Sequence, residues 1–215
     1  MISQSQSYVV GIAGGSASGK STFTKRLLET LPAICPDARV VDLHTDRYFR
    51  VGAPDMPTFV SPSSGKTMPD FNHPDTIDSD RLVADIDALQ QGEESPDVII
   101  VEGHFVLCFA DLRDRLDLSL FVELDPDARA LRRMVRNLAR RGDPLDEHTP
   151  DAIATYFLES AEVGHERYIE PSRVYADLIL RGDGDFSRTA PMIAAMIKTA
   201  LADGMGVSPT QEPTE

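Results

Sequence analysis

The chain has 215 residues, with 21 basic and 35 acidic side chains and a formal net charge of −14 at pH 7. This length favours one compact domain with a sizeable core, and the acidic balance argues against nucleic acid or an anionic membrane surface as the partner. Two cysteines, Cys35 and Cys108, are too few for a disulfide framework, and neither a signal peptide nor an apolar run of membrane-spanning length is present, so we expect a cytoplasmic protein.

The first predicted element is a strand over Tyr8 to Ala13, which leads directly into a glycine-rich loop. The loop matches the pattern G-x-x-x-x-G-K-[ST] and opens a helix predicted from Gly19 to Leu31. Backbone N–H groups of such a loop can surround a phosphate, and the helix N-terminus adds its positive dipole end. Lys20 then reaches the β and γ phosphates, while the Ser21 hydroxyl is a magnesium ligand. The residues predicted to bind ATP are Gly14, Gly15, Ser16, Ala17, Ser18, Gly19, Lys20, Ser21 and Thr22.

A second strand is predicted over Arg39 to Leu43, and Asp46 follows it. Because the carboxyl ends of parallel strands meet at one edge of the sheet, Asp46 is expected near the phosphate loop. A carboxylate there can accept the proton of an acceptor hydroxyl while the γ-phosphoryl group moves in line. Capping of a turn is the alternative role for Asp46.

Residues 47–78 contain five prolines and show no clear periodicity. Loops of this length inside a compact domain are usually functional or disordered. The position directly after the second strand favours a substrate loop over an insertion without a function.

A helix predicted over Ser79 to Gln90 is followed by an apolar strand from Val98 to Val101. Glu102 ends this strand and supplies a carboxylate for magnesium, bound directly or through water, since phosphoryl transfer needs Mg²⁺ beside the β and γ oxygens. An ordinary strand-ending glutamate is the alternative. His104 lies close to this position in the sequence and is a candidate substrate contact.

An arginine-rich helix is predicted over Asp127 to Arg141, after a strand from Leu118 to Leu124. Several of its arginines share one face through spacings of three and four residues. A run of charges is usually a solvated face. Beside a phosphate loop in an acidic chain, a lid that closes over the transferring phosphate is the better explanation.

The remaining elements are a helix over Asp151 to Ile169, a strand over Tyr175 to Leu180 and a helix over Arg188 to Ala202. For His165, in the first of these, we expect packing or helix-end hydrogen bonding. Strands that alternate with helices throughout the chain predict a parallel sheet wrapped by helices.

Six segments in this order resemble the uridine kinase family, within the wider group that also holds phosphoribulokinase and bacterial pantothenate kinase. They span roughly residues 8 to 181, and together they are far more specific than the phosphate loop alone. The segments are Gly14 to Thr22, Asp46-Arg47-Tyr48-Phe49, Phe71-Asn72-His73-Pro74-Asp75, Val101-Glu102-Gly103, the helix from Arg129 to Arg141, and His165 to Pro171 leading to Tyr175-Ala176-Asp177.

The resemblance implies an α/β, three-layer P-loop NTPase fold with a five-stranded parallel sheet, helices on both faces and a helical arginine-rich lid. It implies one kinase domain over residues 1–203, with a substrate loop at about 47–78 and a lid at about 129–150. Residues 204–215 are expected to be a disordered tail.

The resemblance also implies ATP as the donor, the 5′-hydroxyl of a ribonucleoside as the acceptor, Asp46 as the general base, and Ser21 with Glu102 around Mg²⁺. The catalytic candidates are Asp46, Lys20, Arg133, Arg136 and Arg141, the last three as lid arginines. The substrate-binding candidates are Asp46, Tyr48, Phe49, Phe71, Asn72, His73 and His104.

The groups that would read the base depart from the family pattern. Only Gln91 to Asp97 fills the position where a base-reading hairpin usually lies, and Asn72 replaces the aspartate that holds the ribose hydroxyls. Asp143 and Thr155 stand where a lid arginine and a base-contacting glutamine are usual.

Two alternatives to a ribonucleoside kinase stay open. One is a kinase for another small alcohol, such as nicotinamide riboside, pantothenate or a sugar. The other is a nucleotide-binding regulatory ATPase, since phosphate loops also serve switches and adaptors. The sequence leaves a homo-oligomer possible and gives no indication of a nucleic-acid or membrane partner.

Overall fold

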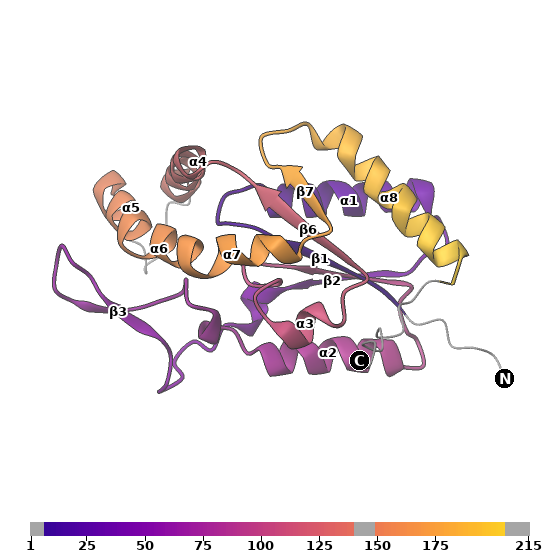
Figure 1. Ribbon diagram of the computed structural model, residues 1–215, viewed down its shortest axis with the longest axis horizontal. Coiled ribbons are helices and arrows are strands. Elements are labelled where there is room, and N and C mark those ends of the chain that lie inside the picture. Colours follow the sequence, from indigo (N-terminus) through magenta and orange to yellow (C-terminus); the bar gives the residue numbers. More distant parts are fainter. Residues whose placement is uncertain (1–6, 140–148, 205–215) are drawn as a thin grey trace, which may run out of the picture.

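The computed structural model describes residues 7–139 and 149–204, and a five-stranded parallel sheet lies at its centre (Figure 1). The strand order is β2-β5-β1-β6-β7, so β1 lies in the middle. This confirms the predicted α/β fold. The strands are β1 (Tyr8–Ala13), β2 (Val40–His44), β5 (Val98–Glu102), β6 (Leu118–Glu123) and β7 (Leu178–Arg181).

Helices cover both faces of the sheet (Figure 1). On one face α1 (Lys20–Ile34) packs beside α8 (Phe186–Ala202), and on the other lie α2 (Ser79–Gln91) and the short α3 (Ala110–Arg113). With helices on both sides, the central strands are buried throughout and read as continuous apolar runs rather than alternating ones. No helix within the described residues is long and apolar enough to cross a membrane.

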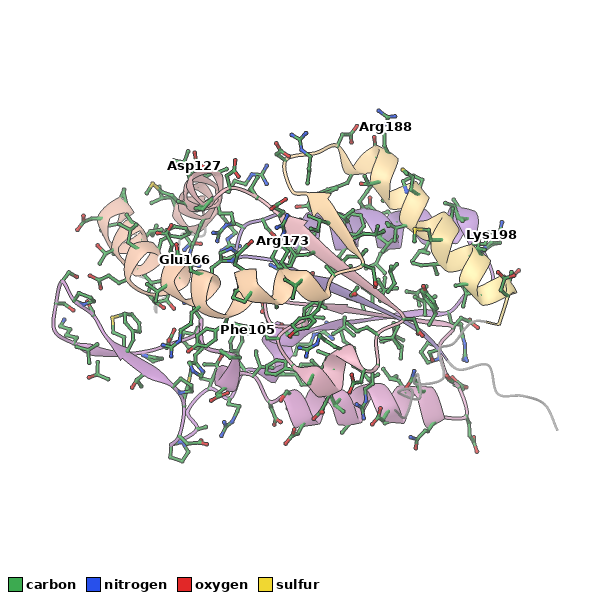
Figure 2. All side chains as sticks on the ribbon, in the orientation of Figure 1. Phe105, Asp127, Glu166, Arg173, Arg188 and Lys198 are labelled. Carbon is green, nitrogen blue, oxygen red and sulfur yellow. The ribbon has the colours of Figure 1, made fainter. Side chains whose placement is uncertain are left out.

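Each face of the sheet contributes to its own core. Val10 of β1 points into the core shared with α1 and α8, and its neighbour Val9 points into the core shared with α2. Phe105 fills the second core near α3, whereas the charged Arg188 and Lys198 lie on the outer surface of α8 (Figure 2). Val9 and Val10 point to opposite faces because successive side chains of a strand alternate between the two faces of the sheet.

A third group of helices lies at the carboxyl end of the sheet, where α4 (Pro126–Ala139) packs beside a long helix over residues 150–172 (Figure 1). Two π-helical turns interrupt this long helix, and such turns are frequent at functional sites. Its parts are α5 (Pro150–Tyr156), the π turn Phe157–Ala161, α6 (Glu162–Gly164), the π turn His165–Ile169 and α7 (Glu170–Ser172), followed by the 3₁₀ turn Arg173–Tyr175.

The segment predicted as an unpatterned loop contains regular structure. A short antiparallel hairpin, β3 (Thr58–Val60) with β4 (Thr67–Pro69), projects from the body of the molecule (Figure 1). Two 3₁₀ turns, Thr45–Tyr48 and Pro74–Thr76, lie before and after it. The hairpin strands have three residues each, too few for periodicity to predict them.

Some predicted boundaries were wrong. The strand expected from Tyr175 begins only at Leu178, because the chain first completes a 3₁₀ turn. The last helix begins at Phe186 rather than Arg188, since the Asp185 carboxylate caps it by accepting from the Ser187 N–H. Residues 140–148 of the expected lid and residues 205–215 of the expected tail lie outside the described residues.

Candidate active site

The phosphate loop curls between β1 and α1 in a backbone conformation that requires glycine at two positions. Gly14 has φ of 137° and Gly19 has φ of 110°, both in the region that L side chains rarely adopt. A Cβ on Gly14 would also lie 2.3 Å from the Val122 carbonyl oxygen. The loop therefore depends on these glycines both for its turn and for its close contact with β6.

Lys20 begins α1 and is almost completely buried, at 5% exposure. Its Nζ donates to the Gly15 carbonyl at 2.9 Å. Burial lowers the pKa of Lys20 to about 8, although the nearby carboxylates of Glu102 and Asp46 act to raise it. An anion bound in the loop would offset the cost of burying this ammonium.

Ser21 and Glu102 meet at the carboxyl end of β5, as the magnesium prediction requires. The Ser21 hydroxyl donates to Glu102 Oε1 at 2.7 Å. Within the described residues no group of three histidine, cysteine or acidic side chains could hold a metal alone. Mg²⁺ fits this pair, because it prefers oxygen ligands and is usually held by one or two carboxylates together with substrate phosphates and water.

A cavity of about 570 Å³ joins these groups. Asp46 and His104 line it together with Lys20 and Glu102. Thr22, on the first turn of α1, lines it as well. The cavity thus joins catalytic and metal candidates from four different elements: Lys20, Ser21, Asp46, Glu102 and Arg136.

The cavity lining also includes the loop after β7 and the start of α8, which sequence analysis did not identify as part of the site, and one more arginine of the predicted lid helix. The loop Gly182 to Gly184 after β7, Phe186 at the start of α8, and Arg132 of α4 line it. Arg132 donates to the Gly182 carbonyl at 2.9 Å and so joins α4 to this loop. The sequence Gly-Asp-Gly after a strand is a usable signal, because small residues at that sheet edge leave room for a ligand.

The arginines of α4 point toward the phosphate loop, as their shared helical face predicts. Arg133 and Arg136 donate to the Ser16 hydroxyl at 3.2 and 3.4 Å. Arg129 is fully buried and donates from Nε to the Leu124 carbonyl. Arg141, the third predicted lid arginine, lies outside the described residues.

His165 was expected to pack or to form a hydrogen bond at the end of its helix, and in the structure it also lies against the phosphate loop. Its Nε2 is 3.3 Å from Glu170 Oε2, but its other side lies against the phosphate loop. A Cβ on Gly15 would be 2.8 Å from His165 Nδ1 and 2.9 Å from an Arg129 nitrogen. Burial, assisted by the charges of Arg129 and Lys20, lowers the pKa of His165 to about 4, so the ring is neutral at pH 7.

The predicted substrate residues are only partly brought together. His104 lines the cavity, and burial lowers its pKa well below the usual range. Tyr48 does not reach the cavity: it is buried and donates from its hydroxyl to Asp85 of α2 at 2.8 Å. His73 accepts from the Asp75 N–H and so caps a 3₁₀ turn.

Two further candidates contact each other rather than the cavity. The rings of Phe49 and Phe71 are packed edge to face, 5.6 Å apart. Phe71 is 39% exposed, whereas Phe49 is partly covered by the α2 core.

Asn72 is buried in a polar cluster against the long helix. Its Nδ2 donates to the Tyr156 and Ser160 hydroxyls at 3.1 and 2.7 Å. Asp70 accepts from the Asn72 N–H and from the Ser160 hydroxyl. The guanidinium of Arg133 lies 5.3 Å from the centre of the Tyr156 ring, which links this cluster to the phosphate loop.

The hairpin is also attached to the long helix. Glu159 accepts from the Ser61 hydroxyl at 2.7 Å and from the Ser63 N–H at 2.9 Å. The ring of Phe59 packs edge to face on Tyr156. The segment after β2 is therefore held to the helix that carries His165.

Comparisons with known proteins identify relatives of this chain. The model of the phosphoribulokinase/uridine kinase family matches residues 84–185. A uridine kinase of Chloroflexus aggregans is 31% identical over 90% of this chain and 95% of its own length. A uridine kinase of Deinococcus deserti is 30% identical over 90% of this chain and 97% of its own.

Two solved structures share the fold. A candidate fructose transport system kinase from Silicibacter sp. TM1040 has a TM-score of 0.61 at 20% identity, over 83% of this chain and 92% of its own. A candidate uridine kinase from Bacillus stearothermophilus has a TM-score of 0.52 at 15% identity, over 81% of this chain and 89% of its own.

Proposed function

This chain belongs to the phosphoribulokinase and uridine kinase family and is an ATP-dependent phosphotransferase that acts on a hydroxyl group, and we propose that its acceptor is the 5′-hydroxyl of a ribonucleoside. The observation that carries the proposal is the shared cavity. A buried ammonium, a hydroxyl paired with a carboxylate, and a separate exposed carboxylate all face it. These are the groups that phosphoryl transfer to an alcohol needs.

Each residue has a distinct role in the transfer. Lys20 and the loop N–H groups bind the β and γ phosphates, and Ser21 with Glu102 would hold Mg²⁺. Bound there, Mg²⁺ would neutralise charge on the β and γ oxygens during transfer. Arg133 and Arg136 add positive charge from the side of α4.

Asp46 acts as the general base. It takes the proton of the acceptor hydroxyl as that oxygen bonds to the γ phosphorus. The bond from the γ phosphorus to the bridging oxygen of ATP breaks, and ADP leaves with the electron pair of that bond. The products are the phosphate monoester and ADP.

The acceptor would enter from the segment after β2. We assign residues 1–203 to one kinase domain, with residues 47–78 as its substrate segment and α4 as the described part of its lid. His104 and the Asn72 cluster border this side of the site. The Gly182 to Gly184 loop and Arg132, which also line the cavity, are suited to the adenosine part of ATP.

ADP release measured against a panel of nucleosides, sugars and vitamin alcohols tests the proposal. We expect ADP formation to require Mg²⁺ and an added ribonucleoside, and phosphorus NMR of the product to report a 5′-phosphate. ADP formation without any added alcohol would instead indicate a regulatory ATPase. If only a sugar or pantothenate is phosphorylated, the protein is a kinase whose acceptor is not a ribonucleoside.

A further inference from the structure

Tyr156 ends α5, where the first π turn of the long helix begins. α5 packs against α4, the helix that carries the arginines near the phosphate loop. The guanidinium carbon of Arg133 in α4 lies 5.3 Å from the centre of the Tyr156 ring. A cation within about 6 Å of an aromatic ring is attracted to the negative face of that ring. The contact between the two helices therefore includes an attraction that only an aromatic side chain can supply.

Arg133 extends from this ring to the phosphate loop. Its Nη1 donates to the Ser16 hydroxyl at 3.2 Å, and both side chains are at least partly buried. The charge of Arg133 also reaches the cavity, because burial and then the charges of Lys20 and Arg133 lower the pKa of His104. Arg133 is therefore placed to act on an anion bound in the loop.

Holding an arginine in one position has a cost that the protein can meet before the ligand arrives. A long side chain loses rotamer freedom when it is fixed, and this loss opposes binding if it occurs only when the ligand binds. Arg133 already contacts both Tyr156 and Ser16 in the nucleotide-free structure. A contact that fixes Arg133 in advance reduces the entropy lost on binding a phosphate.

The Tyr156 ring is held from the segment over residues 47–78. Its hydroxyl accepts from Asn72 Nδ2 at 3.1 Å, and the Phe59 ring packs edge to face on it, with ring centres 6.2 Å apart. Gly164 lets the long helix approach this segment closely, because a Cβ there would lie 2.5 Å from Asn72. The ring that contacts Arg133 is thus fixed on its other sides by residues from a different part of the chain.

We propose that Tyr156 is a positioning residue that holds the Arg133 guanidinium beside the phosphate loop, ready for the phosphates of the nucleotide. The inference rests on the proposed function, since it takes Arg133 as one of the arginines that bind those phosphates. Among the described residues that line the cavity Tyr156 is not included, so it acts through Arg133 rather than by touching the nucleotide.

A ring that only packs the segment over residues 47–78 against the long helix is the competing explanation. Loss of the ring would then lower stability, and any loss of nucleotide affinity would not depend on Arg133. The two explanations differ in whether the effects of changing Tyr156 and Arg133 on nucleotide affinity are additive.

The test is a double-mutant cycle on the full-length protein, in which calorimetry measures binding of a non-hydrolysable ATP analogue with Mg²⁺. Tyr156→Leu keeps an apolar side chain without the ring and should weaken binding by about 5- to 30-fold, the range of a partly desolvated cation–π contact. Tyr156→Phe keeps the ring and should recover most of that loss. In an Arg133→Ala background, which itself weakens binding, Tyr156→Leu should have little further effect.

Tyr175→Leu is the matched control. The Tyr175 ring also contacts a guanidinium, that of Arg113 at 3.8 Å, but it precedes β7 and so lies near the amino ends of the strands, away from the phosphate loop. This variant should bind the analogue as tightly as the wild type. Urea unfolding establishes that each variant is folded, and Tyr156→Met replaces Tyr156→Leu in the cycle if the leucine variant does not fold.

Three results would overturn the inference. They are unchanged affinity in a folded variant without the Tyr156 ring, equal losses in the Phe and Leu variants, and losses from Tyr156→Leu and Arg133→Ala that add fully in the double variant. If the wild-type protein itself does not bind the analogue, the proposed function is wrong as well.

Discussion

Lys20 illustrates how a functional residue can oppose folding. Its ammonium is buried, and its hydrogen bond to the Gly15 carbonyl does not replace the water it has lost. The pKa of Lys20 falls from 10.5 to about 8, which corresponds to roughly 3 kcal/mol. In the nucleotide-free protein the Lys20 ammonium is charged and buried. A bound phosphate would offset the free-energy cost of that burial.

Replacing this charge should stabilise the protein and inactivate it. At pH 7 we expect Lys20→Met to lack turnover and to unfold in urea with a free energy up to ~3 kcal/mol above the wild type. Between pH 8 and 10.5 the unfolded chain binds more protons at Lys20 than the folded chain does, so wild-type stability should rise with pH and the difference should close.

A wild-type protein more stable than Lys20→Met at pH 7 would contradict this interpretation of the buried charge. Lys20→Ala provides a separate test. If this variant keeps more than about a tenth of the wild-type rate, it loses less than about 1.4 kcal/mol of transition-state stabilisation, and the assignment of the phosphate loop is wrong.

Asp46 is the second residue whose role can be isolated. Asp46→Asn keeps the shape of the side chain and removes the proton acceptor. We expect kcat to fall by about 10² to 10⁴ while ATP binding, measured by calorimetry, is retained. An unchanged kcat would mean that another group, such as a water held by Glu102, acts as the general base.

The long helix is the element that joins the two sides of the site. Its adjacent residues Gly164 and His165 face different partners. A Cβ on Gly164 would lie 2.5 Å from Asn72, and His165 lies against Gly15 of the phosphate loop. The helix therefore contacts both the segment over residues 47–78 and the phosphate loop within one turn. This turn lies where the π turn begins.

A double-mutant cycle tests this packing. Gly15→Ala places a methyl group against the His165 ring and should weaken ATP binding at least about tenfold, because an overpacked site must shift. His165→Ala in the same chain opens space and should restore part of the affinity. Calorimetric titration with ATP provides the measurement.

Gly14→Ala is the control for this cycle. Its Cβ would meet the backbone oxygen of Val122, and its φ of 137° disfavours any side chain. His165→Ala should therefore give no rescue of Gly14→Ala. Equal rescue of both variants would mean that His165 does not act through contact with Gly15.

At the scale of the whole molecule, a strongly acidic chain concentrates positive charge at one site. The net charge is −14, yet Lys20 and four arginines of α4 converge on the phosphate loop and the loop after β7. A tetra-anionic nucleotide with its metal is a suitable ligand for such a local field. The polar cluster around Asn72, in contrast, consists of the Asn72 amide, the Tyr156 and Ser160 hydroxyls and the Asp70 carboxylate.

That contrast predicts weak selection among bases. Between α2 and β5 the described chain has no strand where a base-reading hairpin would lie, and the Asn72 amide N–H groups are already bonded to Tyr156 and Ser160. Shape alone discriminates by about 10- to 200-fold, whereas hydrogen-bond readout reaches 10⁴ or more. We expect uridine to be preferred by no more than about tenfold over other nucleosides.

The measurement is kcat/KM for uridine, adenosine, guanosine and nicotinamide riboside under identical conditions. A value for uridine more than about 10³ above the others would contradict the prediction. It would mean that the segment over residues 47–78 builds a pyrimidine site from its own side chains.

The sequence by itself determined the sheet, and it predicted the groups that we propose for catalysis at its edge. Continuous apolar runs predicted the five strands, and the phosphate-loop pattern identified Lys20 and Ser21, because both signals lie in consecutive residues. Asp46 and Glu102 followed from the rule that parallel strands present their carboxyl ends together.

Only the tertiary structure decided which distant side chains meet. Strand register and helix packing bring three such pairs together. They are His165 with Gly15, His44 with Glu102, and Tyr48 with Asp85. No local pattern encodes them, because each joins residues far apart in the chain that become neighbours only when the sheet order and the helix orientations are set.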